Sequence, residues 1–220
     1  MKSAASSEPG GVVQGSAYEL MLAKLADDRR RLKQIQSIEK KIELKRQLLP
    51  DYADWIAGAL AAGKGAQDDV LTTVLVWSID ACAYDNALAI AAYALQHKMT
   101  LPDQYERTLA TMLLDDFSIA YLSGRMESAQ VGVRIMEQVI ALTADFDAPD
   151  QARAKAHKAL AYALIGKVDR SDIDFDQIPQ NTAAQAMPHL TRALALFDNV
   201  GVKKDIERLD RRLKKSASES

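Results

Sequence analysis

The side chains best suited to chemistry in this sequence are three groups of carboxylates. They are Asp68 with Asp69, Asp115 with Asp116, and the run of Asp169, Asp172, Asp174 and Asp176. A metal-dependent nuclease needs two or three carboxylates that converge on Mg²⁺. Neighbouring residues on a helix point about 100° apart, so neither Asp pair converges by itself. The acidic run lacks the glycine and the closing glutamate of a calcium-binding loop. We therefore interpret all three groups as structural.

The remaining reactive residue types do not form a recognisable site. The three histidines, His97, His157 and His189, are isolated in sequence. The chain has a single cysteine, Cys82, so it cannot form an internal disulfide, and we interpret Cys82 as a small buried apolar residue. The segment Gly63-Lys-Gly65 lacks the spacing of a phosphate-binding loop. The sequence thus predicts no metal site and no intrinsic cofactor, and the catalytic residues, if any, are unknown.

Charge is unevenly distributed along the 220 residues, although the net charge is only −2. Residues 24–46 carry nine Lys or Arg against four Asp or Glu, and residues 203–215 carry seven against three. Residues 47–202 carry eleven basic and twenty acidic side chains. Two basic ends on an acidic protein indicate an anionic partner, although two solvated helix faces would give the same pattern.

Phosphate groups are bound by Lys and Arg, so we predict DNA contact from the basic N-terminal segment. The candidate residues are Arg29, Arg30, Arg31, Lys33, Lys40, Lys41, Lys45 and Arg46. Residues 203–215 are a second candidate surface, for DNA or for a protein partner. No short turn between two short helices precedes Pro50, so the mode of docking is left open.

The segment that carries these cations, residues 16–49, is predicted as one long helix or a close pair of helices that ends at Pro50. Its apolar residues recur at steps of three, four or seven and form a narrow stripe. They are Tyr18, Leu22, Leu25, Leu32, Ile35, Ile38, Ile42 and Leu49. A narrow stripe is typical of a coiled-coil seam, which predicts an oligomer; packing within one chain is the alternative.

The rest of the chain is also predicted to be helical, which makes the fold all-α. Expected helices are 51–62 (capped by Asp51), 67–82, 84–96, 103–122, 127–143, 150–165, 182–198 and 202–215. The β-branched content of 67–82 would suit a strand, but its length and its Asp68–Asp69 start favour a helix. Alanines seven apart at 87 and 94, and at 186 and 193, predict close-packed helix hairpins, tetratricopeptide-like in places.

These elements suggest four regions. Residues 1–15 are Ser-, Gly- and Ala-rich and are expected to be a disordered lead-in. Residues 16–49 form the basic helical region, 50–201 a helical core domain, and 202–220 a basic helix with a frayed tail. No signal peptide and no apolar run of membrane-spanning length is visible, so we expect a cytosolic protein.

Several segments, taken in order, resemble the small terminase subunit (terminase endonuclease subunit) family of cohesive-end temperate tailed phages. They are Tyr18-Glu-Leu-Met-Leu-Ala-Lys-Leu-Ala-Asp-Asp-Arg29, Lys45-Arg-Gln-Leu-Leu-Pro50, Gly63-Lys-Gly-Ala-Gln-Asp-Asp69, Val74 to Asp80, Ala87-Leu-Ala-Ile-Ala-Ala-Tyr-Ala-Leu95 with Leu101-Pro102, Ala152-Arg-Ala-Lys-Ala-His-Lys158 and Val200-Gly-Val-Lys-Lys-Asp-Ile-Glu-Arg-Leu209. The resemblance covers about residues 18–215, and the co-linear set carries it rather than any single motif.

The resemblance implies a protein that binds the cohesive-end site on concatemeric double-stranded phage DNA in the host cytoplasm. Such subunits form homo-oligomers, often rings, and direct the large subunit, an ATPase, in cutting and packaging DNA into the prohead. Mg²⁺ would then be needed for DNA cutting by the holoenzyme, the complex of the small and large subunits. The chain ends soon after Lys215, whereas family members carry a longer basic tail, so no DNA contact is assigned to such a tail.

Two other functions fit parts of the sequence. A helical-repeat adaptor without a nucleic-acid role would explain the hairpin pattern and the acidic middle, but not the two basic ends. A stand-alone DNA endonuclease would fit the name of the family, but its catalytic site is not visible. Whether this chain is itself an enzyme is therefore left open.

Overall fold

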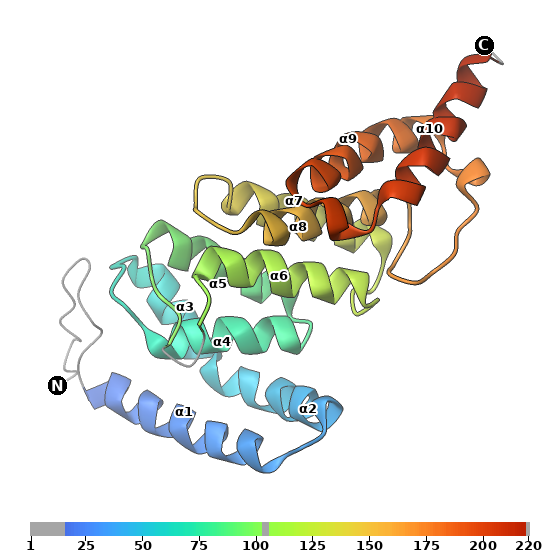
Figure 1. Ribbon diagram of the computed structural model, residues 1–220. Coiled ribbons are helices and arrows are strands. Elements are labelled where there is room, and N and C mark those ends of the chain that lie inside the picture. The colour runs from blue at the N-terminus through green and yellow to red at the C-terminus, as the bar shows by residue number, and fades with distance from the viewer. Residues whose placement is uncertain (1–15, 103–105, 219–220) are drawn as a thin grey trace. The chain divides into compact units, whose positions relative to one another are not determined.

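The computed structural model describes residues 16–102 and 106–218, and within them the protein is all-α (Figure 1). Ten α-helices and three short 3-10 helices account for the regular structure of these residues, and no β-strand occurs among them. The chain divides between Leu109 and Ala110 into two compact units, so the predicted core region 50–201 contributes to both. The predicted lead-in 1–15 lies outside the described residues.

Unit 1 is built around one apolar helix. Its helices are α1 (Ser16–Gln34), α2 (Ile38–Leu48), the 3-10 helix η1 (Leu49–Tyr52), α3 (Ala53–Ala62), α4 (Asp69–Asp80) and α5 (Tyr84–Gln96). Every residue of α4 from Val70 to Ile79 is buried, because α1, α2, η1, α3 and α5 all pack against it. The Asp68 carboxylate caps α4 by accepting a hydrogen bond from the Leu71 amide at 2.9 Å. The helix predicted over 67–82, rather than a strand, is thereby confirmed.

Two local predictions in unit 1, the Asp51 cap and the buried Cys82, are corrected by the structure. Asp51 does not cap α3: Tyr52 occupies the cap position, without a side-chain bond, and Asp51 pairs with Lys24 instead. The predicted stop at Pro50 is confirmed, because α2 ends at Leu48; Pro50 lies in the first turn of η1, where its missing amide hydrogen costs nothing. Cys82 is only half-buried; it follows the end of α4 and has a left-handed backbone, with φ of +65°.

Unit 2 contains the remaining helices, and the last four α-helices pack as successive neighbours (Figure 1). They are α6 (Leu109–Leu122), α7 (Ala129–Leu142), α8 (Asp150–Leu164), the 3-10 helix η2 (Phe175–Gln177), α9 (Gln180–Leu196), the 3-10 helix η3 (Asp198–Val200) and α10 (Lys203–Ser218). The helix expected from residue 103 begins only at Leu109, and α10 runs to Ser218 rather than ending at 215.

Small residues allow close helix packing in both units. Ala87 and Ala94 on α5, and Ala186 and Ala193 on α9, are fully buried, as the seven-residue spacing predicted. The packed pairs are α4 with α5 and α8 with α9. On α7, a Cβ atom at Gly132 would lie 2.3 Å from the ring of Tyr121, so only glycine fits there. No described helix is both long and apolar enough to cross a membrane.

Candidate nucleic-acid interface

The predicted basic segment forms a helical hairpin, α1 and α2, joined by residues 35–37 (Figure 1). Ser37 starts α2 by accepting a hydrogen bond from the Lys40 amide. On α1, Tyr18, Leu25 and Leu32 are buried and face the rest of unit 1. These three members of the apolar stripe are therefore used inside the chain, whereas Ile38, another member of the stripe, is 75% exposed.

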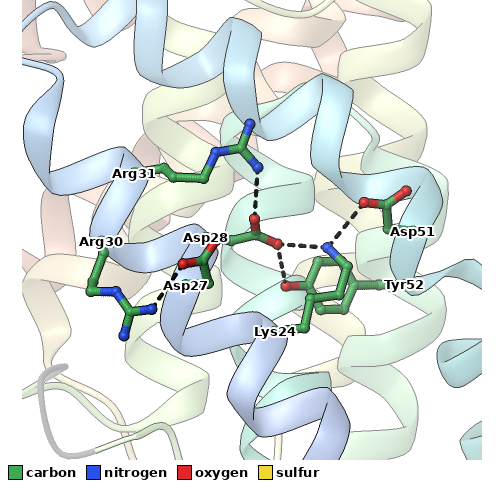
Figure 2. A network of polar contacts seen from close by, with 7 residues as sticks. All are labelled: Lys24, Asp27, Asp28, Arg30, Arg31, Asp51 and Tyr52. Atoms are coloured by element: carbon green, nitrogen blue, oxygen red, sulfur yellow. Dashed lines mark hydrogen bonds and ion pairs between the residues drawn. The ribbon is translucent and has the colours of Figure 1, made fainter.

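A buried carboxylate, Asp28, anchors α1 to η1 (Figure 2). Asp28 is 2% exposed and accepts hydrogen bonds from Lys24 at 2.7 Å, the Tyr52 hydroxyl at 2.8 Å and Arg31 at 3.0 Å. Lys24 also pairs with Asp51 at 3.0 Å and lies over the Tyr52 ring. Every hydrogen-bonding need of the buried carboxylate is thus met, which is the condition for tolerating it inside a protein.

The electrostatics of this network are set by competing effects. Burial would raise the pKa of Asp28, but the bonds from Lys24, Tyr52 and Arg31 outweigh it and hold the pKa below its ordinary value. Burial and the Asp28 carboxylate raise the pKa of Tyr52 far above its ordinary value, so its hydroxyl stays a donor. Asp28 is therefore a charged anchor rather than an acid–base group.

A second anchor fixes α2 to the end of α4. The Lys45 ammonium group pairs with Asp80, and the Arg46 guanidinium donates to the carbonyl of Ala81 at 3.2 Å. Both cations come from the predicted DNA-binding set. Their engagement means that they hold the hairpin in place, and only part of their charge faces solvent.

The eight predicted DNA-contacting residues thus fall into two groups. The first group has contacts within the protein or is partly buried, and it consists of Arg29, Arg31, Lys45 and Arg46. One guanidinium nitrogen of Arg29 is buried without a hydrogen-bond partner, and Arg31 donates a hydrogen bond to Asp28. Arg30, Lys33, Lys40 and Lys41 lie within a few residues of the 35–37 turn. Of these, Lys33 and Lys40 are exposed and have no ion-pair partner among the described residues, Arg30 pairs only with exposed Asp27, and Lys41 is half-buried.

The second basic segment forms α10, which packs on α9 and η2. Its cations are partly used inside unit 2: Arg212 donates to the Ile178 carbonyl at 2.9 Å, and Arg208 lies over the Phe175 ring. The buried Asp205 accepts a hydrogen bond from the Tyr162 hydroxyl and pairs with Lys167 at 3.8 Å. The buried side of α10 thus holds unit 2 together, and the exposed side carries the remaining charge.

At least one carboxylate in each of the three groups considered for a nuclease has a structural partner. Asp68 caps α4 and also accepts from the Trp55 indole at 2.9 Å. Asp115 pairs with Lys155, Asp169 with Lys158 at 2.9 Å, and Asp174 caps η2. Among the described residues, no three His, Cys, Asp or Glu side chains come together in a way that could hold a metal ion.

One pair of residues that looked isolated in sequence is brought together by the fold. The Nδ1 atoms of His157 on α8 and His189 on α9 are 3.1 Å apart, and the two rings stack. Burial, followed by the neighbouring His189 and two arginines, lowers the pKa of His157 to about 4. The pair is therefore neutral near pH 7 and joins the two helices by a hydrogen bond.

Comparison with known proteins identifies the family to which this chain belongs. A family model described as "Phage small terminase subunit" matches residues 22–151, which include the whole α1–α2 turn and its cations. The chain belongs to the phage small terminase subunit family. This small terminase subunit therefore has its role in phage DNA packaging.

Two curated relatives extend the comparison over most of the chain. The small terminase subunit is 41% identical over 199 residues to the "Terminase, endonuclease subunit" of Escherichia phage P2, covering 90% of this chain and 75% of that protein. It is 26% identical over 206 residues to the "Probable terminase, endonuclease subunit" of Haemophilus phage HP1, covering 90% and 71%. No solved structure gives a significant match.

The Asp28 network was not found from the sequence. The ion pairs of Asp28 within α1 could have been recognised from the sequence. Asp28 lies four residues after Lys24 and three before Arg31, a spacing that places the three side chains on one helix face. The bond from Tyr52 could not have been recognised from the sequence, because Tyr52 lies 24 residues from Asp28 along the chain.

Proposed function

We propose that this small terminase subunit binds the cohesive-end site on concatemeric phage DNA with the turn of its α1–α2 hairpin. The supporting observation is the exposed, unpaired state of Lys33 and Lys40 on either side of residues 35–37, within the described part of the chain. Arg30 and Lys41 extend the same cationic tip. Ammonium groups without internal partners are free to displace counterions from DNA phosphates.

The anchors described above favour this assignment. A hairpin held by Asp28 and by Lys45 with Asp80 presents its tip in a fixed orientation, so little order is lost on binding. Phosphate contacts of this kind set position and register on the duplex, while sequence is read at base edges.

The test is a titration of labelled cohesive-end duplex over a salt series, with a scrambled duplex beside it. The double variant Lys33→Gln, Lys40→Gln should weaken binding and make the slope of log K against log salt less steep by about two, because about two phosphate contacts are lost. The control variant Lys64→Gln, Lys98→Gln removes two exposed lysines that lie outside both basic segments, and it should bind as the wild type does. An unchanged salt slope in the Lys33, Lys40 variant would refute the assignment.

We further propose that the subunit acts as a homo-oligomer and directs a large ATPase subunit in the host cytoplasm. Leu20 on α1 and Ile38 on α2 are the candidate contact residues for self-association, because they are large apolar side chains that are 72% and 75% exposed. Light scattering at micromolar concentration should give a mass of several chains, and Leu20→Ser with Ile38→Ser should lower it. A mass of one chain for the wild type would exclude the oligomer.

For the cutting reaction, we propose that the large subunit supplies the metal site and that Mg²⁺ is required only by the holoenzyme. The structural engagement of Asp68, Asp115 and Asp169 supports this division of labour, although the relatives are named endonuclease subunits. The purified chain should leave cohesive-end DNA intact with Mg²⁺. Nicking by the isolated chain would assign the endonuclease to this subunit.

A further inference from the structure

Unit 2 contains a long groove that the hairpin assignment does not use. Two adjoining hollows of about 650 and 590 Å³ share Lys158, Asp169 and Arg170 along their linings. The walls come from α6, α8, the loop after α8, η3 and the start of α10. We call this surface the unit 2 groove.

The unit 2 groove has an excess of positive charge. Its lining includes seven Lys or Arg and three Asp. Each of these three aspartates pairs with a lining lysine, namely Asp169 with Lys158, Asp198 with Lys203 and Asp205 with Lys167. Lys155 and Arg208 are matched by Asp115 and Asp172, which lie outside the lining.

The excess charge therefore resides on Arg170 and Lys204. Both side chains are exposed, and neither has an ion-pair partner among the described residues. Both line the same hollow, one from the loop after α8 and the other from α10. Two unpaired cations at the edge of a concave surface attract an anionic group.

The backbone of Arg170 is held in a conformation that glycine would prefer. Its φ is +61°, at the third position of a turn closed by the Ser171 amide, which donates to the Val168 carbonyl at 3.2 Å. The Ser171 hydroxyl accepts from the Val168 amide and donates to the Val168 carbonyl. These bonds within the turn fix the backbone of Arg170 where it lines the groove.

The groove also has an apolar part, which phosphates would not use. Ile119 on α6 is 45% exposed and lines the groove together with Val168, Val200 and half-buried Phe197. A DNA duplex presents its phosphates on a convex surface and carries no aliphatic side chain to cover Ile119. An extended peptide with carboxylates and an apolar side chain would meet both features.

We propose that the unit 2 groove binds an acidic peptide segment of a partner protein, with carboxylates at Arg170 and Lys204 and an apolar side chain on Ile119. The inference is independent of DNA contact by the α1–α2 turn, because the turn and the groove share no residue. Arg170 lines both hollows, whereas Lys204 lines one, so Arg170 is the central cation of the proposed site.

The test uses the full chain and a library of short random peptides displayed on phage particles. Enriched sequences should contain at least two Asp or Glu and one aliphatic or aromatic residue. A labelled synthetic copy of the enriched peptide should bind the double variant Arg170→Gly, Lys204→Gln about tenfold more weakly than the wild type. Ile119→Ser should weaken it as well.

The control variant Lys64→Gln, Lys98→Gly removes two positive charges from exposed side chains outside both basic segments. Lys98 also has a positive φ, +54°, so glycine relieves the same kind of strain there and the fold is equally protected. This variant should bind the peptide as the wild type does. Enrichment without acidic residues, or equal binding by both double variants, would overturn the proposal. Loss of duplex affinity in the Arg170, Lys204 variant with unchanged peptide binding would make the groove a nucleic-acid surface instead.

Discussion

Replacing Asp28 by Asn tests how strongly the buried carboxylate holds the hairpin. The substitution keeps the size of the side chain and removes its charge. Three donors then lose an anionic acceptor, namely Lys24, Arg31 and the Tyr52 hydroxyl. Only the Tyr52 hydroxyl lies on a residue with no exposed surface, so its loss is the least compensated by water.

The magnitude follows from these exposures. A hydrogen bond to a charged group contributes about 1.5–3 kcal/mol and a neutral one about 1, so the weakened Tyr52 bond costs about 1 kcal/mol. The side chains of Lys24 and Arg31 are 32% and 50% exposed and regain water, which limits each loss to about 0.5 kcal/mol. The total is a destabilisation of about 2 kcal/mol. Asp28→Ala should cost more, about 3–4 kcal/mol, because Tyr52 then has no acceptor at all.

Urea unfolding followed by tryptophan fluorescence measures this change directly. The chain has two tryptophans, Trp55 and Trp77, and both lie in unit 1, so the signal reports the unit that contains Asp28. With a slope of about 1–2 kcal/mol per molar urea, the midpoint should fall by about 1–2 M. The control Asp27→Asn, which removes an exposed ion pair with Arg30, should change stability by less than about 0.5 kcal/mol.

The pH dependence gives a second check with a defined sign. The folded-state pKa of Asp28 lies below the ordinary value of 3.8, so the unfolded chain binds this proton more readily. The stabilisation is therefore fully present above pH 3.8 and is lost as pH falls through the folded pKa. The wild type and Asp28→Asn should differ by a constant amount near neutral pH and converge in acid. Equal unfolding of the two at pH 7 would show that the network contributes nothing.

Three further predictions concern packing and titration. Gly132→Ala should destabilise unit 2 by about 1–3 kcal/mol, measured by circular dichroism during thermal unfolding, because the added Cβ would lie 2.3 Å from the Tyr121 ring; an unchanged transition would contradict this. Gly58→Ala should instead stabilise unit 1 by about 0.5–1 kcal/mol in the fluorescence assay, because nothing lies within 4 Å of its Cβ and alanine favours the helix; a loss of stability would argue against it. The lowered pKa of His157, about 4, means that the unfolded chain binds its proton first, so stability should fall between pH 6.5 and about 4 by up to about 1.4 kcal/mol per pH unit. His157→Gln should flatten that slope, and an equally steep slope in the variant would assign the effect to other groups.

The α-helical fold and the basic character of the N-terminal segment were determined by the sequence alone. Helix formation depends on residues three and four apart, and the apolar runs, the Pro50 stop and the Asp68 start are all local signals. The helix over α4 followed from such signals against its β-branched content. The cap predicted at Asp51 failed because a long-range ion pair with Lys24 competes for the carboxylate.

Which of the basic residues remain available was decided only by the tertiary structure. The sequence alone does not distinguish four cations of the same segment, namely Lys33, Lys40, Lys45 and Arg46. In the fold, Lys45 meets Asp80 and Arg46 meets the Ala81 carbonyl, each 35 residues away, whereas Lys33 and Lys40 have no ion-pair partner among the described residues. Charge is a property of each residue, but its partner depends on which distant segments pack together, and no local pattern encodes that choice.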